Sequence, residues 1–272
     1  MDCHPTGRIA SVDGLRGLLA IVVVVYHFDH YRFAAFTESP SRIAVATFFI
    51  MSGYVLTRAW SGNFPVFLVR RFIRLWPLFA TCLALAALIN RQTPQWSLYF
   101  WYPFIYDPDQ SPILNLNGPM WSLFIEAWAM LFMPLIVWCG RSSARVIVAS
   151  AIAIAAARFE HWAIYAPLFI AGAFLAGCDF NLRVLNGPLV QWCGKISYSL
   201  YLSHWVVFRA CDLWAPNFAP WIEIPLAFAV ARVLCALVDQ PSIALSRRCA
   251  KFLERVRFGD GLRRAAVLLP SR

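Results

Sequence analysis

The sequence predicts an all-α, polytopic membrane protein with about eight transmembrane helices and both termini in the cytoplasm. Of its 272 residues, 60 % are hydrophobic and only 14 % are charged, whereas a soluble domain carries roughly 25 % charged residues. Too few polar side chains remain to cover a soluble surface. The apolar residues also gather in eight runs that are broken by Pro, Gly or charged residues, as expected of helical spans.

A helical span needs about 20 mostly apolar residues. The eight runs occupy residues 14–31, 43–60, 75–89, 121–139, 146–157, 162–178, 196–214 and 222–238. The aromatic, proline-broken segment 96–106 is predicted to be interfacial or re-entrant. Because the runs lack the alternation of membrane strands, we predict helices.

The basic residues predict the orientation. With the N-terminus inside, only four basic residues fall outside: Arg32, Arg42, Arg91 and Arg158. The others outside the spans fall on the cytoplasmic side, as the positive-inside rule requires. The net charge of +10 therefore favours lipid headgroups over nucleic acid as partners. The predicted division is a transmembrane domain at 1–241 and a basic cytoplasmic or interfacial tail at 242–272, in an inner (plasma) membrane of a bacterial type.

Ionisable side chains inside spans are costly, so each is a functional candidate. Arg16 and His27 of the first span are eleven residues apart, so they share one helix face with about 16 Å of rise between them. An imidazole is suited to act as a base near neutral pH. The alternative is a histidine that is hydrogen-bonded for packing. His27, Asp29 and His30 have no further ligand nearby to complete a metal site, so none is predicted.

Arginines precede the third span. Arg70 and Arg74 share a face at i,i+4, with Arg71 beside them, and Arg58 ends the second span. Guanidinium groups bind phosphates in bidentate fashion. The pattern is equally typical of positive-inside anchoring.

Two later spans also carry polar stripes. Ser122 and Glu126 are i,i+4 in the fourth span, where a buried Glu needs an Arg or His partner. Ser197, Tyr201 and His204 fall on one stripe of the seventh span. Ordinary interhelical contacts are the alternative for both stripes.

Taken together, these segments resemble the membrane-bound acyltransferase family 3. The matching motifs, in order, are residues 9–17 with the Arg16-x10-His27 spacing, 48–54 followed by Arg58, 70–77, Trp121-Ser122-Leu123 with Glu126, and 196–204. The resemblance implies transfer of an acyl group, often acetyl, from acyl-CoA to a hydroxyl of a carbohydrate or lipid-linked glycan.

The resemblance also suggests a role for each candidate. Arg16, Arg70, Arg71 and Arg74 would hold the phosphates of CoA, which is a donor substrate rather than a permanently bound cofactor. His27 would be the catalytic base or would accept the acyl group transiently, with Glu126 orienting or charge-balancing it or an arginine. Arg58, Ser122, Tyr201 and His204 would line the substrate path. Two alternatives remain, namely a transporter or flippase, and a shortened, inactive acyltransferase relative.

Overall fold

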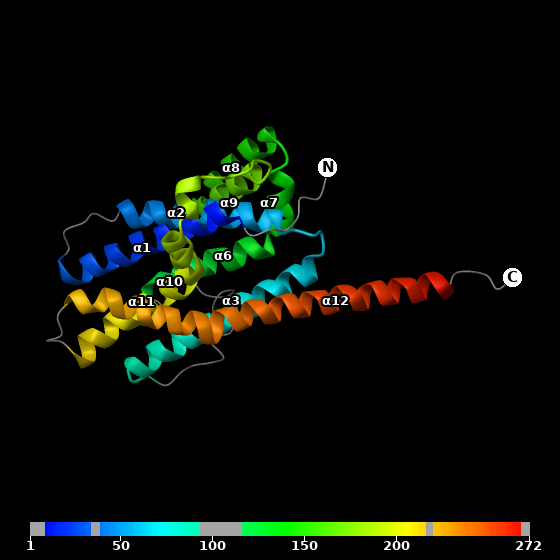
Figure 1. The fold of residues 1–272 in the computed structure, drawn as a ribbon. Helices are drawn as coiled ribbons and strands as arrows, with labels where there is room; N and C mark the ends of the chain where they lie inside the picture. Colours follow the sequence, from blue (N-terminus) through cyan, green and yellow to red (C-terminus); the bar gives the residue numbers. More distant parts are fainter. Residues whose placement is uncertain (1–8, 34–38, 93–115, 216–219, 268–272) are drawn as a thin grey trace.

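The computed structural model describes residues 9–33, 39–92, 116–215 and 220–267, and regular structure in these ranges is helical throughout. The longer helices are α1 (Ala10–Arg32), α2 (Ser39–Arg58), α3 (Phe64–Ile89), α6 (Trp121–Leu131), α7 (Met133–Cys139), α8 (Ser143–Ala156), α9 (Ala166–Leu175), α10 (Pro188–Trp214), α11 (Glu223–Leu234) and α12 (Gln240–Val267). In Figure 1, α3, α11 and α12 form one side of an elongated bundle, and α7, α8 and α9 lie at the opposite side.

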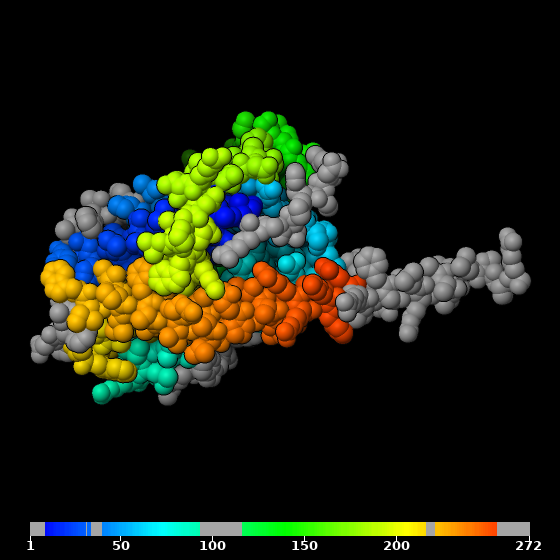
Figure 2. Space-filling view, viewed as in Figure 1, coloured from blue at the N-terminus to red at the C-terminus, as the bar shows by residue number. Residues whose placement is uncertain are grey.

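Short turns link these helices. They are the 3-10 turns η2 (Gly118–Met120), η3 (His161–Tyr165), η4 (Arg183–Asn186) and η5 (Pro220–Ile222), and the π-helical turn η6 (Cys235–Asp239). Figure 2 shows the segment around η4, in yellow-green, lying across the start of α1. The Ser11 hydroxyl accordingly donates to the Asn186 side chain at 3.1 Å.

Each of the eight predicted runs coincides with helical structure, which supports a helical membrane protein. Among the described residues, three helices are long and apolar enough to cross a bilayer, within Ala10–His30, Phe64–Ile89 and Glu223–Glu254. A fourth span is possible if Gly118–Leu131 and Met133–Cys139, bent by 74° at Phe132, count as one. The predicted number of eight spans is therefore larger than the number that helix length and hydropathy support. The predicted interfacial segment 96–106 lies outside the described residues.

Helix α3 begins earlier than the third apolar run. The Asn63 side chain accepts a hydrogen bond from the backbone N–H of Val66 at 3.4 Å and caps the first turn, with Pro65 in the position that tolerates proline. Arg70, Arg71 and Arg74 consequently lie inside the helix rather than in front of it. The helix also continues through Pro77.

The end of the eighth run differs from the prediction in a similar way. The predicted run ends at residue 238, yet α11 continues through η6 into α12. One residue, Gln240, separates Pro241 from the π-helical turn η6, and a local π adjustment of this kind lets a helix continue through a proline. The predicted boundary at 241/242 therefore falls within a continuous helical segment.

Two pairs of glycines bring helices into close contact. A Cβ atom on Gly17 of α1 would lie 2.5 Å from the backbone N of Gly194 in α10. Gly53 of α2 and Gly172 of α9 approach the backbones of Phe169 and Ile50 in the same manner. Small residues at helix crossings are the usual way for membrane helices to pack. The first pair fixes α1 against α10, the helices that carry the two histidines considered below.

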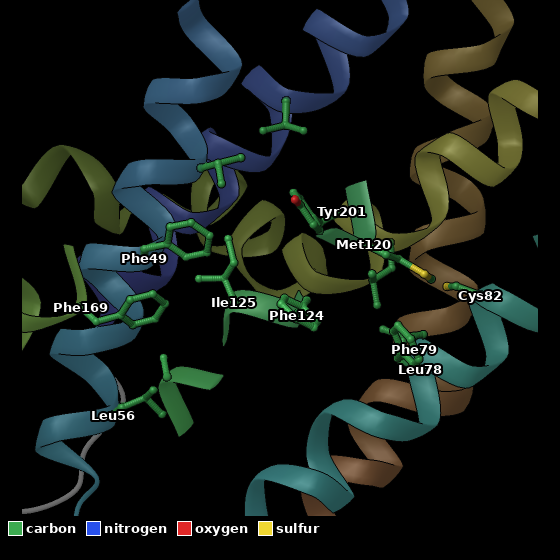
Figure 3. Close-up of a cluster of buried hydrophobic side chains, with 14 of the residues drawn as sticks. Phe49, Leu56, Leu78, Phe79, Cys82, Met120, Phe124, Ile125, Phe169 and Tyr201 are labelled. Carbon is green, nitrogen blue, oxygen red and sulfur yellow. The ribbon is translucent and has the colours of Figure 1, made fainter. Parts of the chain in front are cut away.

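The buried apolar core lies between α2, α3, α6, α9 and α10. Figure 3 shows Phe49 beside Phe169, and Met120 close to Cys82, with Tyr201 in the same cluster. The rings of Phe49 and Phe169 are 5.0 Å apart between centroids. These contacts hold the polar side chains of α2, α3, α6 and α10 around one cavity.

Candidate active site

A cavity lies where α1, α2, α3, α6 and α10 converge. Its charged and hydroxyl-bearing lining consists of Arg16, Ser52, Arg71, Arg74, Ser122, Glu126, Ser197, Tyr198 and Tyr201. About 80 Å³ is open to the centres of water-sized molecules, several times the space that one water needs. The cavity, or chamber, therefore has room for several water-sized molecules, and its charged and hydroxyl-bearing side chains lie among apolar ones.

The lining is rich in positive charge. Its described side chains include the guanidinium groups of Arg16, Arg71 and Arg74 and the single carboxylate of Glu126. The Ser52 hydroxyl donates to Glu126 Oε1 at 3.4 Å, which ties α2 to α6. Charges of one sign in a low-dielectric cleft attract counter-ions strongly. This chamber is accordingly suited to an anionic group.

Helix geometry explains which arginines line the chamber. At about 100° per residue, Arg74 lies between Arg70 and Arg71 on the wheel of α3. Leu75, which also lines the cavity, lies beyond Arg71. The cavity faces the arc from Arg74 to Leu75, and Arg70 is outside it. The i,i+4 pair expected from the sequence is replaced by the Arg71 and Arg74 pair.

A hydroxyl cluster closes the chamber at α6 and α10. The hydroxyl oxygens of Ser122 and Tyr201 are 2.8 Å apart. Tyr201 donates to the backbone O of Pro119 at 3.0 Å, and Ser122 lies 3.2 Å from the same oxygen. Two of the four predicted path residues, Ser122 and Tyr201, therefore meet at one point of the cavity wall.

The predicted catalytic histidine lies outside this lining. His27 of α1 is half-buried, and its Nδ1 lies 2.9 Å from Nε2 of the fully buried His204 in α10. His204 Nδ1 is 3.0 Å from the backbone O of Leu200. His204 is one turn beyond Tyr201, with 6.2 Å between the two ring centroids. The imidazole pair thus adjoins the hydroxyl cluster.

Of the remaining predicted residues, Glu126 lines the cavity, whereas Arg58 and Arg70 lie outside it. Glu126 lies among the arginines, so its surroundings favour the charge-balancing role over orientation of His27. Arg58 lies at a second, shallow polar groove, where it binds the Asp179 carboxylate at 3.1 Å and donates to the Tyr54 hydroxyl at 2.8 Å.

Three features of the candidate site were not predicted from the sequence. Ser52 and Tyr198 line the cavity, and Tyr198 donates to the backbone O of Leu75 at 3.0 Å. Both are polar residues within apolar runs, and this position in the sequence could have identified them as candidates. The direct contact between His27 and His204 had no signal in either run alone, because it depends on how α1 and α10 pack. Over the ranges that the structure covers, no three His, Cys, Asp or Glu side chains gather in a metal-binding arrangement.

Comparison with known proteins finds a family model and individual relatives that are similar to this chain. A family model described as an acyltransferase domain matches residues 9–176. Protein 2 in the picA locus of Rhizobium radiobacter is 35 % identical over 94 residues, covering 32 % of this chain and 48 % of that protein. Acyltransferase MdmB of Streptomyces mycarofaciens is 29 % identical over 152 residues, covering 47 % of this chain and 39 % of the relative. The matches span less than half of either relative's length, and no solved structure matches.

Proposed function

Because the chain belongs to the acyltransferase 3 family, we propose that it is an integral membrane O-acyltransferase. It moves an acyl group, acetyl being the simplest, from acyl-CoA to a hydroxyl of a carbohydrate or glycolipid. The observation that carries this proposal is the chamber lined by three guanidinium groups and one carboxylate, with an imidazole pair beyond its hydroxyl wall. Acyl-CoA is consumed as a substrate and is not a resident cofactor.

The donor binds through its phosphates. Arg16, Arg71 and Arg74 hold phosphate oxygens by charge-assisted hydrogen bonds, which Arg makes in bidentate fashion. Glu126 balances part of the positive charge when the chamber holds no anion. The acyl-pantetheine arm extends from this chamber along α1, past Ser122 and Tyr201. Arg16 and His27 are separated by about 16 Å of helical rise, so the thioester end reaches the imidazole while the phosphates stay with the arginines.

His27 serves as the general base. It takes the proton of the acceptor hydroxyl as that oxygen attacks the thioester carbonyl carbon. A C–O bond forms and the C–S bond breaks, and the departing thiolate receives the proton from the His27 imidazolium. The products are an ester and free CoA thiol. General base catalysis typically contributes about 10²–10⁴-fold to the rate.

The arginine chamber lies on the cytoplasmic side, where acyl-CoA is available. Eight spans with both termini in the cytoplasm, in the inner membrane of a bacterium, are consistent with the distribution of basic residues. The acceptor approaches the imidazole pair from the other end of α1.

The proposal is tested by reconstituting the full chain in liposomes with radiolabelled acetyl-CoA and a cell-envelope glycan fraction. We expect labelled glycan and an equal amount of free CoA thiol. The His27→Gln variant should lose about 10²–10⁴-fold of this activity. His30→Gln is the matched control, since His30 is exposed on the same helix, and it should retain the wild-type rate.

The alternatives give different results in the same assay. Movement of labelled solute across the vesicle without thioester cleavage would indicate a transporter. A folded chain that neither cleaves the thioester nor labels glycan would indicate an inactive relative. Full activity in a well-expressed His27→Gln variant would refute the role of His27.

A further inference from the structure

His204 occupies the centre of a short hydrogen-bonded chain that the reaction scheme above does not use. Its side chain is fully buried on α10, between the backbone O of Leu200 at 3.0 Å and Nδ1 of His27 at 2.9 Å. Each imidazole nitrogen is therefore within hydrogen-bonding distance of one partner. The two contacts together determine where the protons lie.

The carbonyl of Leu200 fixes the first proton. A carbonyl oxygen only accepts hydrogen bonds, so His204 Nδ1 carries a hydrogen and donates it. In a neutral imidazole the other nitrogen is then an acceptor. His204 Nε2 therefore accepts, and the hydrogen between the two rings belongs to His27 Nδ1. The Nε2 atom of His27 is left with a lone pair.

A doubly protonated His204 would reverse the second hydrogen bond, but its surroundings argue against it. A buried imidazolium needs a nearby counter-charge. Within the part of the chain that the structure describes, no carboxylate is hydrogen-bonded or ion-paired to either ring. When both imidazole rings are neutral, each nitrogen of His204 has a hydrogen-bonding partner and no uncompensated charge is buried.

The orientation of the rings agrees with a hydrogen bond of this kind. Their planes differ by 12° and their centroids are 5.1 Å apart, far more than the 2.9 Å between the nitrogens. The rings therefore meet through their nitrogen edges, with the N–H and the lone pair nearly in a shared plane. Trp205 packs against His27 at 88°, with 5.3 Å between centroids, and limits its rotation.

We propose that His204 is a positioning residue that holds His27 in the Nδ1–H tautomer and presents the Nε2 lone pair to the acceptor hydroxyl. The inference rests on the proposed function, in which His27 is the base. His204 itself touches neither substrate. It acts as a carboxylate or carbonyl does when it orients a histidine through the second ring nitrogen.

The direct test is the position of the proton on His27. We would label the full chain with ¹⁵N-histidine in lipid and record solid-state NMR spectra, in which protonated and unprotonated ring nitrogens are separated. With five histidines in the chain, the spectrum of His27→Gln identifies the His27 signals. In the wild type we expect hydrogen on Nδ1 and none on Nε2.

Two variants connect this proton to turnover. His204→Phe keeps a ring but removes the acceptor, so the Nδ1 proton of His27 should no longer be fixed. We expect kcat to fall about 10- to 100-fold, as for other residues that orient a functional histidine, with the KM for acetyl-CoA changed by less than about twofold. His204→Gln retains an amide oxygen as acceptor and should recover part of kcat.

Each result decides the matter. A wild-type His27 with its proton on Nε2 overturns the proposal, and so does a folded His204→Phe variant with unchanged kcat. If His204→Phe does not fold, the wild-type spectrum and the kcat of His204→Gln still decide. Full activity in His27→Gln would instead refute the role of His27 as the base, and the wild-type spectrum would separately report the contact with His204.

Discussion

Helix α1 carries one arginine near each end, and the surroundings of these two arginines differ. Near its C-terminus, Arg32 lies between two carboxylates, with one guanidinium nitrogen 2.8 Å from Asp212 of α10 and a hydrogen bond to the buried Glu223 of α11. Near its N-terminus, Arg16 lines the chamber in which three guanidinium groups accompany the carboxylate of Glu126. One environment holds more negative than positive groups, and the other holds more positive than negative groups.

This difference distinguishes a structural tie at Arg32 from the proposed binding site at Arg16. The Arg32 contacts join α1, α10 and α11, and their opposite charges satisfy one another without a ligand. The Arg16 chamber holds an excess of desolvated positive charge. Such an arrangement costs folding free energy unless an anion enters it. Substitutions in the two environments should accordingly change different properties.

The largest expected effect is on stability, at Arg32. Arg32→Gln leaves the buried Glu223 carboxylate without its cation, and breaking a buried pair costs about 3–5 kcal/mol. Because Arg32 is about one-fifth exposed, with 22 % of its side-chain surface accessible, we expect the low end of this range. Thermal unfolding in detergent measures the loss, while KM for acyl-CoA should be unchanged in protein that remains folded.

The double variant Arg32→Gln, Glu223→Gln provides the control. Replacing both charges removes the buried, unpaired carboxylate, so part of the lost stability should return. A double variant less stable than Arg32→Gln would contradict the account of Arg32 as a structural tie.

A smaller effect is expected at Arg71, on donor binding. Arg71→Ala removes a charged hydrogen-bond donor from the chamber, which is worth about 1.5–3 kcal/mol and weakens CoA binding roughly 10- to 150-fold. Isothermal titration of CoA into the purified protein measures this change. The variant should be at least as stable as the wild type without ligand, because like charges are relieved.

Arg70→Ala is the matched control on the same helix. Arg70 carries the same charge one residue away and lies outside the cavity, so its loss should change the affinity for CoA by less than about threefold. Equal losses in the two variants would indicate that general positive charge, rather than the chamber, attracts the donor.

The smallest effect is expected at Arg58. Its partner Asp179 is largely exposed, with 79 % of the side-chain surface accessible, and exposed pairs contribute about 0–1 kcal/mol. Arg58→Ala should therefore lower stability by less than about 1 kcal/mol in thermal unfolding and leave the affinity for CoA close to that of the wild type. A loss of CoA affinity as large as that of Arg71→Ala would extend the donor site into the second groove.

Local sequence was sufficient to locate the helices and the candidate residues. Composition and the apolar runs predicted an all-helical chain, because long apolar runs without the alternation of membrane strands indicate transmembrane helices. The polar residues inside those runs, from Arg16 to His204, were conspicuous since burial makes them costly. Helix ends were less accurate: α3 starts at Phe64 through an Asn63 cap, and helical structure continues past Pro241.

What the sequence by itself determined is which side chains are too polar for their surroundings and how they are spaced along each helix. Tertiary structure alone decided which of them meet. It selected Arg71 over Arg70, placed Glu126 among arginines, and set His27 against His204 on a helix 177 positions away along the chain. The physical reason is that spacing fixes angles within one helix, whereas contacts between helices depend on the crossings that glycines such as Gly17 and Gly194 permit.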